Sequence, residues 1–325
     1  MLAEFDLIRR YFMSPQEAQA TDGVALGNGD DATLLLPQAG QQLVVSVDTS
    51  VTDVHFPCDA PAYAIGHRAL AVALSDLAAM GAASRWCLMA LTLDQRVFTD
   101  SEMAEHWLSE YASGFHTLCQ RHATILVGGD VTSGALTIGV TVMGEVPIGK
   151  AMTRSGAQAG DAIAVTGALG GGAGGLGLWK QGERDISHPL LQRYLLPEPR
   201  LAAGIALRGI ATAAMDISDG LLADLAHLRN ASKVGAAIDL EALPLVDGLE
   251  HQVGLEAARK AALSGGDDYE LLVTLAPADV ALAQAELAKL GIPLTVIGRC
   301  SETLGVTGVA PADYIGWQHF SGVTL

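Results

Sequence analysis

The residues with the clearest chemical potential are aspartates that stand next to glycines. They occur in the segments GDD, GGD, SDG and GGDD, several of which follow apolar runs. Six aspartates belong to these segments, and three more, Asp48, Asp76 and Asp216, stand beside or inside apolar runs. The six are Asp30, Asp31, Asp130, Asp219, Asp267 and Asp268. A strand that ends in Gly-Gly-Asp exposes backbone N–H groups beside a carboxylate, which suits a phosphate with its metal ion. Asp and Gly are also ordinary turn residues, so spacing alone does not show that these acids converge.

Asp76 stands apart because it lies between Leu74 and Leu77 in a strongly apolar helical pattern. A buried carboxylate costs free energy unless it is paired or bound to a metal. The alternative is a position on the polar margin of the same helix. Asp76 is therefore a candidate metal ligand with an open structural alternative.

Three other side chains are candidates for contacts with a ligand. Arg154, in the loop segment Thr-Arg-Ser-Gly, could contact a phosphate, with a solvated surface arginine as the equal alternative. His55 follows the apolar segment that leads to Asp48, although a lone histidine is more often structural or exposed. Trp317, near the C-terminus, either packs against the core or covers a ring-containing ligand.

Composition limits the partners of the chain. Its 325 residues are 50% hydrophobic, which suits two domains with large cores. Lys and Arg total 19 against 36 Asp and Glu, and the formal net charge is -17. No basic block occurs, so binding to the nucleic-acid backbone is not expected. An anionic ligand would need help from a divalent metal held by the surplus carboxylates.

Cysteine usage and hydropathy predict a cytoplasmic protein with no membrane partner. The cysteines are scattered without a CxxC pair, at Cys58, Cys87, Cys119 and Cys300. This pattern predicts reduced thiols. The segment MLAEFDLIRRYF shows no signal-peptide pattern, and the uncharged stretch 162–179 contains too much glycine for a membrane span.

The first half of the chain supplies alternating elements that would position the acids. Strands are predicted at residues 42–47, 86–93, 125–127 and 135–146, and helices at residues 3–12, 63–80 and 99–122. The first strand ends at Asp48, and the third leads into the segment Gly128-Gly129-Asp130. Thr99 and Glu102 have the spacing of a capping box.

The second half repeats the mixture of strands and helices. Strands are predicted at residues 161–166, 213–217, 236–240, 269–275 and 293–299, and helices at residues 199–209, 221–232, 255–263 and 277–290, with a glycine-rich loop and helix after the first strand. Both halves are therefore α/β. The loop-like segment 147–160 separates them, which predicts domains 1–148 and 149–325.

Taken together, the motifs resemble the thiamine-monophosphate kinase family, in order from Phe5 to Phe320. They are G-N-G-D-D-A, S-V-D-T, H-F, L-S-D-L-A-A-M-G-A, V-G-G-D-V-T, T-R-S-G, D-I-S-D-G-L, S-G-G-D-D-Y-E-L and G-W-x-H-F. The combination of S-D-L-A-A-M-G-A, D-x-S-D-G-L and S-G-G-x-D-Y-E is specific. Single motifs are shared with the superfamily of aminoimidazole ribonucleotide synthetase, selenophosphate synthetase and the hydrogenase-maturation dehydratase.

The resemblance implies an α/β (α+β) fold of two domains, like that of aminoimidazole ribonucleotide synthetase. The N-terminal α/β domain would bind ATP and magnesium and would pair with a second copy into a barrel-like homodimer. The C-terminal α+β domain would complete the nucleotide and substrate site. The implied reaction is ATP-dependent phosphorylation of thiamine monophosphate to thiamine diphosphate, by direct in-line transfer with several Mg²⁺ ions.

The resemblance also implies roles for individual residues. Those that would hold magnesium are Asp31, Ser46, Val47 through its backbone, Asp48, Asp76, Asp130, Asp216 and Asp219. Those that would contact ATP are Gly129, Asp130, Arg154 and Ser218, and those that would contact thiamine monophosphate are His55, Asp267 and Trp317. No residue would act as an acid or base: Asp219 would position metal and Arg154 would neutralise transferred charge. Asp30 would support this set or add a ligand, and Asp267 stands where the family usually has Glu.

Two alternatives stay open at this point. The first is another ATP-dependent enzyme of the superfamily, such as aminoimidazole ribonucleotide synthetase, which a formylglycinamidine substrate would reveal. The second is a non-catalytic metal-binding protein. Mg²⁺ would then stabilise the protein against heat, and ATP would add nothing further.

Overall fold

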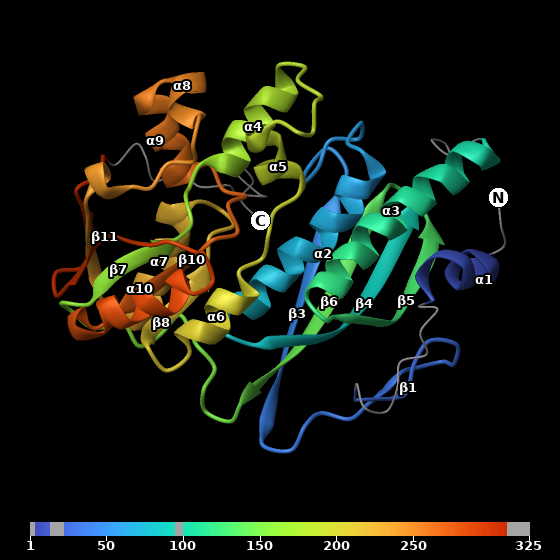
Figure 1. Cartoon of the computed structure of the whole chain (residues 1–325), viewed down its shortest axis with the longest axis horizontal. Helices are drawn as coiled ribbons and strands as arrows, with labels where there is room; N and C mark the ends of the chain where they lie inside the picture. The colour runs from blue at the N-terminus through green and yellow to red at the C-terminus, as the bar shows by residue number, and fades with distance from the viewer. Residues whose placement is uncertain (1–3, 14–22, 95–99, 311–325) are drawn as a thin grey trace, which may run out of the picture. The chain divides into compact units, whose positions relative to one another are not determined.

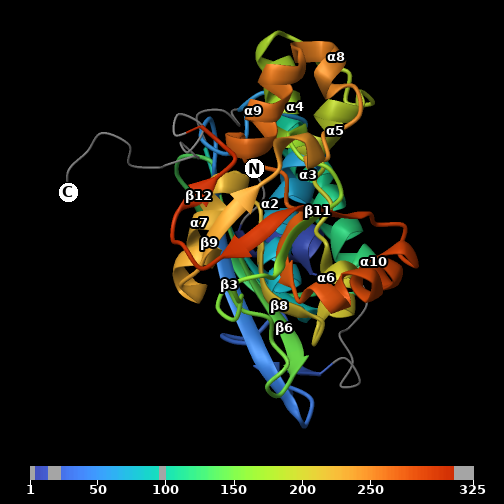
Figure 2. The same cartoon turned by 90° about the vertical axis from the view of Figure 1, so that its left-hand side faces the viewer.

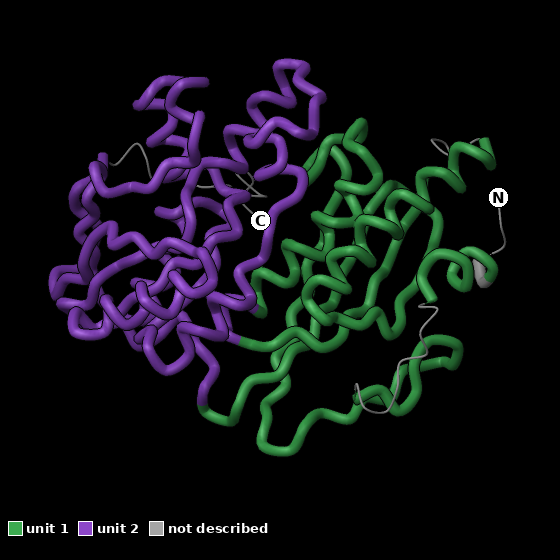
Figure 3. Tube along the Cα trace, in the orientation of Figure 1, with its two compact units in different colours: residues 1–77, 82–149 green, residues 78–81, 150–325 purple. Residues whose placement is uncertain are grey.

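The computed structural model describes residues 4–13, 23–94 and 100–310. The chain divides into two compact units, residues 1–77 with 82–149 as unit 1 and residues 78–81 with 150–325 as unit 2 (Figure 3). Segment 78–81 thus belongs to unit 2, although the sequence predicts it to lie in the N-terminal domain. Both units combine sheets with helices. The predicted α/β (α+β) class is confirmed.

Unit 1 is built on a four-stranded sheet in the order β3-β6-β4-β5. Its strands are β3 (Gln41–Val51), β4 (Ala83–Leu93), β5 (Ile125–Ser133) and β6 (Thr137–Pro147). β4 and β5 are parallel, whereas the other two pairs are antiparallel. The short strands β1 (Val24–Leu26) and β2 (Leu34–Leu35) form a separate antiparallel pair. Val24 and Leu35 pack with Trp86 and Met143 in a small core of their own.

Two long helices, α2 (Ala62–Ala79) and α3 (Ser101–Arg121), lie on one face of this sheet (Figure 1). Glycines let their backbones touch. A Cβ on Gly66 would lie 2.1 Å from the carbonyl oxygen of Tyr111, and one on Gly114 would lie 2.0 Å from that of Tyr63. The chain starts with α1 (Glu4–Leu7) and the π-helical turn η1 (Ile8–Phe12).

Three expected boundaries in unit 1 are wrong. β3 does not end at Asp48, because it pairs with β6 along its whole length to Val51. β5 does not end before the Gly-Gly-Asp segment, since it runs on to Ser133 beside β4. The N-cap of α3 is Asp100, whose side chain accepts a hydrogen bond from the Glu102 N–H at 2.9 Å. Thr99, the predicted cap, lies outside the described residues.

Unit 2 contains a six-stranded sheet in the order β12-β9-β11-β7-β10-β8. Its strands are β7 (Ala162–Thr166), β8 (Ala211–Asp216), β9 (Gly235–Ile238), β10 (Leu271–Leu275), β11 (Leu294–Ser301) and β12 (Val306–Thr307). β12 is parallel to β9, and the other neighbours are antiparallel. The sequence predicts the first five of these strands and misses β12.

Helices cover both faces of this sheet. They are α4 (Gly171–Lys180), α5 (Pro189–Leu195), α6 (Leu201–Leu207), α7 (Leu221–Ser232), α8 (Leu249–Val253), α9 (Leu255–Ser264) and α10 (Val280–Ala288), with the 3-10 turns η3 (Leu240–Ala242) and η4 (Pro277–Asp279). On one face, Leu222 and Leu225 of α7 share a core with Ile163, Met215 and Leu272 of the strands. α6 and α10 lie on the other face (Figure 1), and α4, α5, α8 and α9 gather at one end of the unit (Figure 2). α5 and α8 are absent from the sequence prediction.

Among the described residues, no helix combines the length and the apolar character that crossing a lipid bilayer requires.

The close contact of α2 and α3 at their glycines predicts that a larger side chain there destabilises the protein. Gly114→Ala should lower the free energy of unfolding by about 2–3 kcal/mol, because the new methyl group overlaps a backbone carbonyl that cannot move without separating the helices. Gly177→Ala in α4 is the matched control, since a Cβ there meets no atom within 4 Å. Helix propensity predicts a neutral or slightly stabilising effect for this control. Urea unfolding followed by circular dichroism measures both, and equal midpoints would contradict the close contact.

Candidate active site

A cavity of about 1070 Å³ lies within unit 1. Asp31, Gly129 and Asp130, predicted from the family resemblance to bind metal or ATP, border it together with Asp30. The rest of the lining is largely apolar and includes Phe12. A ring bearing phosphates would find an apolar wall here, with carboxylates that can hold cations for the phosphates.

Gly129 owes its place to the close approach of β4. Its φ is 155°, and a Cβ there would lie 1.9 Å from the carbonyl oxygen of Met89. Parallel pairing continues through Met89 with Gly129 and Ala90 with Asp130. The Gly-Gly-Asp segment is therefore part of a strand rather than a turn, and Asp130 is presented from an exposed position in that strand.

A second group of predicted ligands lies where β3 meets α2. The Ser46 hydroxyl donates a hydrogen bond to the Asp76 carboxylate, so Asp76 has a polar partner although its helix is apolar. Ser46 and Asp48 are half-buried on one face of β3, whereas Val47 on the opposite face is 65% exposed. The alternation follows from strand geometry. Ser46 and Asp76 are thus brought together, and Asp48 lies on the same strand face as Ser46.

His55 is fixed in the turn that follows β3. Its Nδ1 accepts a hydrogen bond from the Val51 N–H at 2.9 Å, and its carbonyl oxygen accepts one from Arg68 Nε at 3.2 Å. Because Nδ1 is an acceptor, the neutral ring carries its proton on Nε2. The ring can therefore donate from Nε2 to an anionic group.

In unit 2, β8 delivers Asp216 and the loop that carries Ser218 and Asp219. Oδ2 of Asp224, in the first turn of α7, accepts hydrogen bonds from the N–H groups of Ser218 at 3.0 Å and Asp219 at 3.1 Å. Burial, with the charges of Asp216 and Asp219, raises the pKa of Asp224 to about 7. The sequence reasoning missed Asp224, although an acid in the first turn of a helix directly after S-D-G is a detectable signal.

Asp267 lies beside this loop, because backbone pairing continues past the end of β8. The Asp267 N–H donates to the Ser218 carbonyl and the Tyr269 N–H to the Ile217 carbonyl, each at 2.8 Å. Asp267 and Tyr269 have φ values of 61° and 50°. A left-handed conformation costs a non-glycine residue about 1–2 kcal/mol, so other contacts must hold it. One of these is the Tyr269 hydroxyl, which donates to Asp267 Oδ1 at 2.8 Å.

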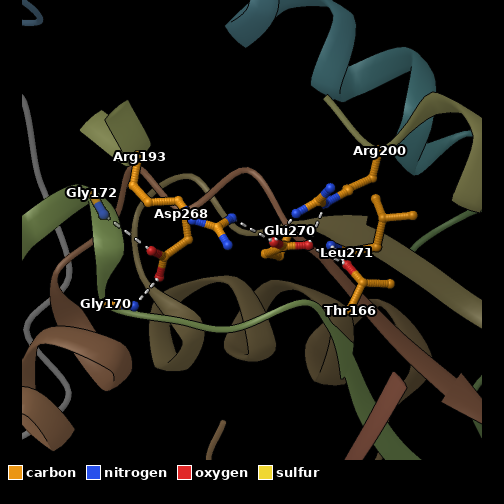
Figure 4. A network of polar contacts seen from close by, with 8 residues as sticks. All are labelled: Thr166, Gly170, Gly172, Arg193, Arg200, Asp268, Glu270 and Leu271. Atoms are coloured by element: carbon orange, nitrogen blue, oxygen red, sulfur yellow. Dashed lines mark hydrogen bonds and ion pairs between the residues drawn. The ribbon is translucent and has the colours of Figure 1, made fainter. Parts of the chain in front are cut away.

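The next acids of this segment, Asp268 and Glu270, have partners of their own (Figure 4). Asp268 accepts hydrogen bonds from the N–H of Gly170 at 2.9 Å and of Gly172 at 3.4 Å, at the start of α4. Glu270 is fully buried and ion-paired with Arg200. In the sequence, Asp268 stands out only as part of S-G-G-D-D, and the buried role of Glu270 is not predicted. A Glu beside an apolar strand can be recognised as a buried anchor only when its ion-pair partner, here Arg200, is known.

Two predicted site residues remain, Arg154 and Trp317. Arg154 is exposed, and its carbonyl oxygen accepts a hydrogen bond from the Ser232 hydroxyl at 2.9 Å. Trp317 lies outside the described residues. Within unit 2, the structure therefore brings together Asp216, Ser218 and Asp219 with Asp267.

The donor set fits magnesium by chemistry. All the predicted ligands offer oxygen, which Mg²⁺ prefers. In residues 4–13, 23–94 and 100–310, no group of three or more His, Cys, Asp or Glu side chains is arranged to hold a metal ion. Mg²⁺ usually uses one or two carboxylates with water and substrate phosphates, so such a cage is not required. Burial is the main cause of the raised pKa of Asp224, and the negative charges of Asp216 and Asp219, which a bound cation would offset, add to it.

Comparison with known proteins defines the class. Residues 29–146 match the family model of the AIR synthase related protein, N-terminal domain, and residues 158–309 match that of the C-terminal domain. Both domains of an AIR synthase related protein are therefore present, in their usual order along the chain.

More similar relatives narrow the class. Thiamine-monophosphate kinase of Salmonella typhimurium is 40% identical over 328 residues, covering 98% of each chain. The crystal structure of thiamine-monophosphate kinase from Stenotrophomonas maltophilia K279a has a TM-score of 0.82 at 44% identity, covering 88% of this chain and 91% of that one. AaThiL complexed with AMPPCP and TMP has a TM-score of 0.76 at 29% identity, covering 97% and 96%. The chain belongs to the thiamine-monophosphate kinase family, as its motifs predict.

The raised pKa of Asp268 predicts how the stability of the protein changes with pH. Burial, partly opposed by the Gly170 and Gly172 N–H groups, raises that pKa to about 7, and the carboxylates of Glu270 and Asp267 add to the rise. The folded state then holds a proton that the unfolded chain loses near pH 4, so stability falls as pH rises from about 4 to about 7. Asp268→Asn removes this fall. From pH 5 to pH 8, the variant should gain roughly 1–3 kcal/mol relative to wild type.

Urea unfolding at several pH values measures this gain. Glu250→Gln in α8 is the control for loss of an exposed charge in the same unit. A constant difference between Asp268→Asn and wild type across this range would show that Asp268 does not hold a proton in the folded state.

Proposed function

We propose that this chain transfers the γ-phosphoryl group of ATP to thiamine monophosphate, giving ADP and thiamine diphosphate. The observation that carries the proposal is the pairing of two loops in unit 2. One carries Asp216, Ser218 and Asp219, and the other carries Asp267, with the Asp267 N–H hydrogen-bonded to the Ser218 carbonyl at 2.8 Å. The family and the AaThiL complex with AMPPCP and TMP support the choice of substrates.

The chemistry requires no general base. The acceptor is a phosphate that is already anionic at neutral pH, so it can attack the γ-phosphorus directly. The difficulty is electrostatic, because two polyanions must approach in a chain of net charge -17. Catalysis then depends on alignment and on neutralising charge during an in-line transfer.

Carboxylates of both units are proposed to hold Mg²⁺ for this purpose. The proposed ligands are Asp31, Ser46, the Val47 backbone, Asp48, Asp76 and Asp130 in unit 1, and Asp216 and Asp219 in unit 2. When bound, Mg²⁺ would neutralise phosphate oxygens and orient them for transfer. Asp219 positions metal, Ser46 and Asp76 orient one another, and Asp30 supports the set from the border of the unit 1 cavity.

The remaining proposed contacts divide between the two substrates. Gly129, Asp130, Arg154 and Ser218 contact ATP, where Gly129 offers backbone N–H and Arg154 a positive charge. His55 can donate from Nε2 to the phosphate of thiamine monophosphate. Asp267 offers a carboxylate to its cationic thiazolium ring, and Trp317 an aromatic face.

Strand β3 supports a homodimer. It is an edge strand of the unit 1 sheet (Figure 1), and Leu43, Val45 and Val47 on its outward face are 45%, 55% and 65% exposed. A long apolar edge strand needs a partner to avoid uncontrolled association. A second copy of the chain that pairs with β3 would cover these apolar side chains and occupy the free edge of the sheet.

We also assign the enzyme to the cytoplasm. Its four cysteines are free thiols in the structure, and such thiols are typical of a reducing compartment. ATP as co-substrate agrees with this assignment.

The reaction is tested by incubating purified protein with ATP, Mg²⁺ and thiamine monophosphate and separating the products. Thiamine diphosphate and ADP should form in equal amounts. Folded protein that consumes ATP only with a formylglycinamidine ribonucleotide would contradict the proposed acceptor.

Asp219→Asn tests the metal-positioning role. The change keeps the side chain's shape but removes its charge, so kcat should fall by at least about 100-fold. The melting temperature should stay close to that of wild type. Glu250→Gln, an exposed acid of the same unit, should keep full activity. Near wild-type kcat in Asp219→Asn would rule out the proposed role.

Val45→Glu tests the dimer. A charge in the centre of the apolar β3 face should convert a dimer into a monomer at micromolar concentration, measured by size-exclusion chromatography with light scattering. Val253→Glu in α8 is the matched control, because Val253 is 41% exposed in the other unit. A monomeric wild type, or dimers of both variants, would contradict the assigned face.

A further inference from the structure

Glu270 is a fully buried carboxylate surrounded by donors (Figure 4). Arg200 binds it through two atoms, with Nε 2.7 Å from Oε2 and Nη2 2.5 Å from Oε1. The Thr166 hydroxyl donates to Oε2 at 2.7 Å, and Arg193 Nη1 lies 3.5 Å from Oε1. A buried charge with this many donors is fixed in position.

The network is tied to the backbone on both sides of Glu270. The Thr166 hydroxyl, which donates to Glu270, also accepts the Leu271 N–H at 2.8 Å. The Glu270 carbonyl accepts the Ile217 N–H at 2.8 Å. A Cβ on Gly167 would lie 2.0 Å from Glu270 Oε1, so the carboxylate fills the space beside that residue. A shift of the Glu270 side chain would therefore displace the backbone segment to which Glu270 belongs.

This backbone segment is the loop that carries Asp267. Only Asp268 and Tyr269 separate Asp267 from Glu270, and both Asp267 and Tyr269 hold left-handed conformations. Such conformations persist only where surrounding contacts enforce them. Asp268 anchors the middle of the segment on Gly170, and Glu270 anchors its end. The conformation of the Asp267 loop thus depends on the contacts of Asp268 and Glu270.

The neighbouring loop has an anchor of its own. Asp224 accepts the N–H groups of Ser218 and Asp219 and belongs to α7, outside the Glu270 network. The two loops are linked, because the Ile217 N–H donates to the Glu270 carbonyl. With Asp224 as a second anchor, the Asp216–Asp219 loop should respond less than the Asp267 loop to loss of the Arg200–Glu270 pair.

We propose that the Arg200–Glu270 ion pair is a positioning device for Asp267 and sets the affinity for the phosphate acceptor rather than for ATP. The inference rests on the proposed function, in which Asp267 contacts thiamine monophosphate. In this proposal, Arg200 and Glu270 act through the loop and not by contact with a substrate.

The test replaces the ion pair by neutral groups of similar size, in the double variant Arg200→Met with Glu270→Gln. Replacing both charges avoids leaving one buried and unpaired, so the fold should survive. The KM for thiamine monophosphate should rise about tenfold. The KM for ATP should stay within about twofold of wild type. Arg259→Met with Glu241→Gln is the control, since it removes another ion pair of unit 2 outside the network.

Each outcome decides the proposal. Unchanged constants for both substrates, or equal rises for both, would overturn it, because the pair would then be only a structural feature. If the double variant does not fold, Arg200→Lys decides, since it keeps the charge but loses the two-atom contact. It should raise the acceptor KM alone, and an unchanged acceptor KM would overturn the proposal. Wild-type protein without thiamine diphosphate synthesis would instead contradict the proposed function.

Discussion

Electrostatic repulsion is the constraint on which the rest of the molecule depends. A chain with formal net charge -17 and few cationic side chains cannot attract two polyanions by itself. Its resources are carboxylates that can hold cations and backbone N–H groups that can face phosphates. Burial, together with the negative charges of Asp216 and Asp219, raises the pKa of Asp224 to about 7. Carboxylates therefore lie close enough in this part of unit 2 to oppose one another's ionisation, and bound cations would offset that repulsion.

Buried carboxylates also shape the loops of unit 2. Asp224 accepts the backbone N–H groups of one loop, and Asp268 accepts those at the start of α4. Glu270 is satisfied by Arg200 and Thr166 instead. Acids that serve as internal acceptors thus hold the loops that carry the acids proposed to meet ligands. This division explains how closely spaced aspartates, Asp219 and Asp224 in one segment and Asp267 and Asp268 in the other, can have different roles.

Much of this was predictable from local sequence. The helix around Asp76 follows from apolar spacing and ends at Ala79, within a residue of the predicted end. The loop of Asp216 and Asp219 follows a short apolar strand, as expected. Family motifs then predict which acids act in one reaction, which spacing alone leaves open.

Other features depend on partners that are distant in sequence. β3 passes Asp48 because Val140 lies opposite it, and β5 passes Gly129 because Met89 does. Glu270 becomes a buried anchor only through Arg200, 70 residues away. No local pattern encodes these partners, so strand ends were predicted at Gly and Asp where tertiary pairing continues.

Calorimetric titration of ATP into the protein, with Mg²⁺ and then with EDTA, tests the central claim most directly. If the carboxylates serve to hold cations for the phosphates, ATP should bind at least about tenfold more tightly with Mg²⁺. Equal affinity in EDTA would contradict the account, because the acidic residues would then take no part in binding the nucleotide.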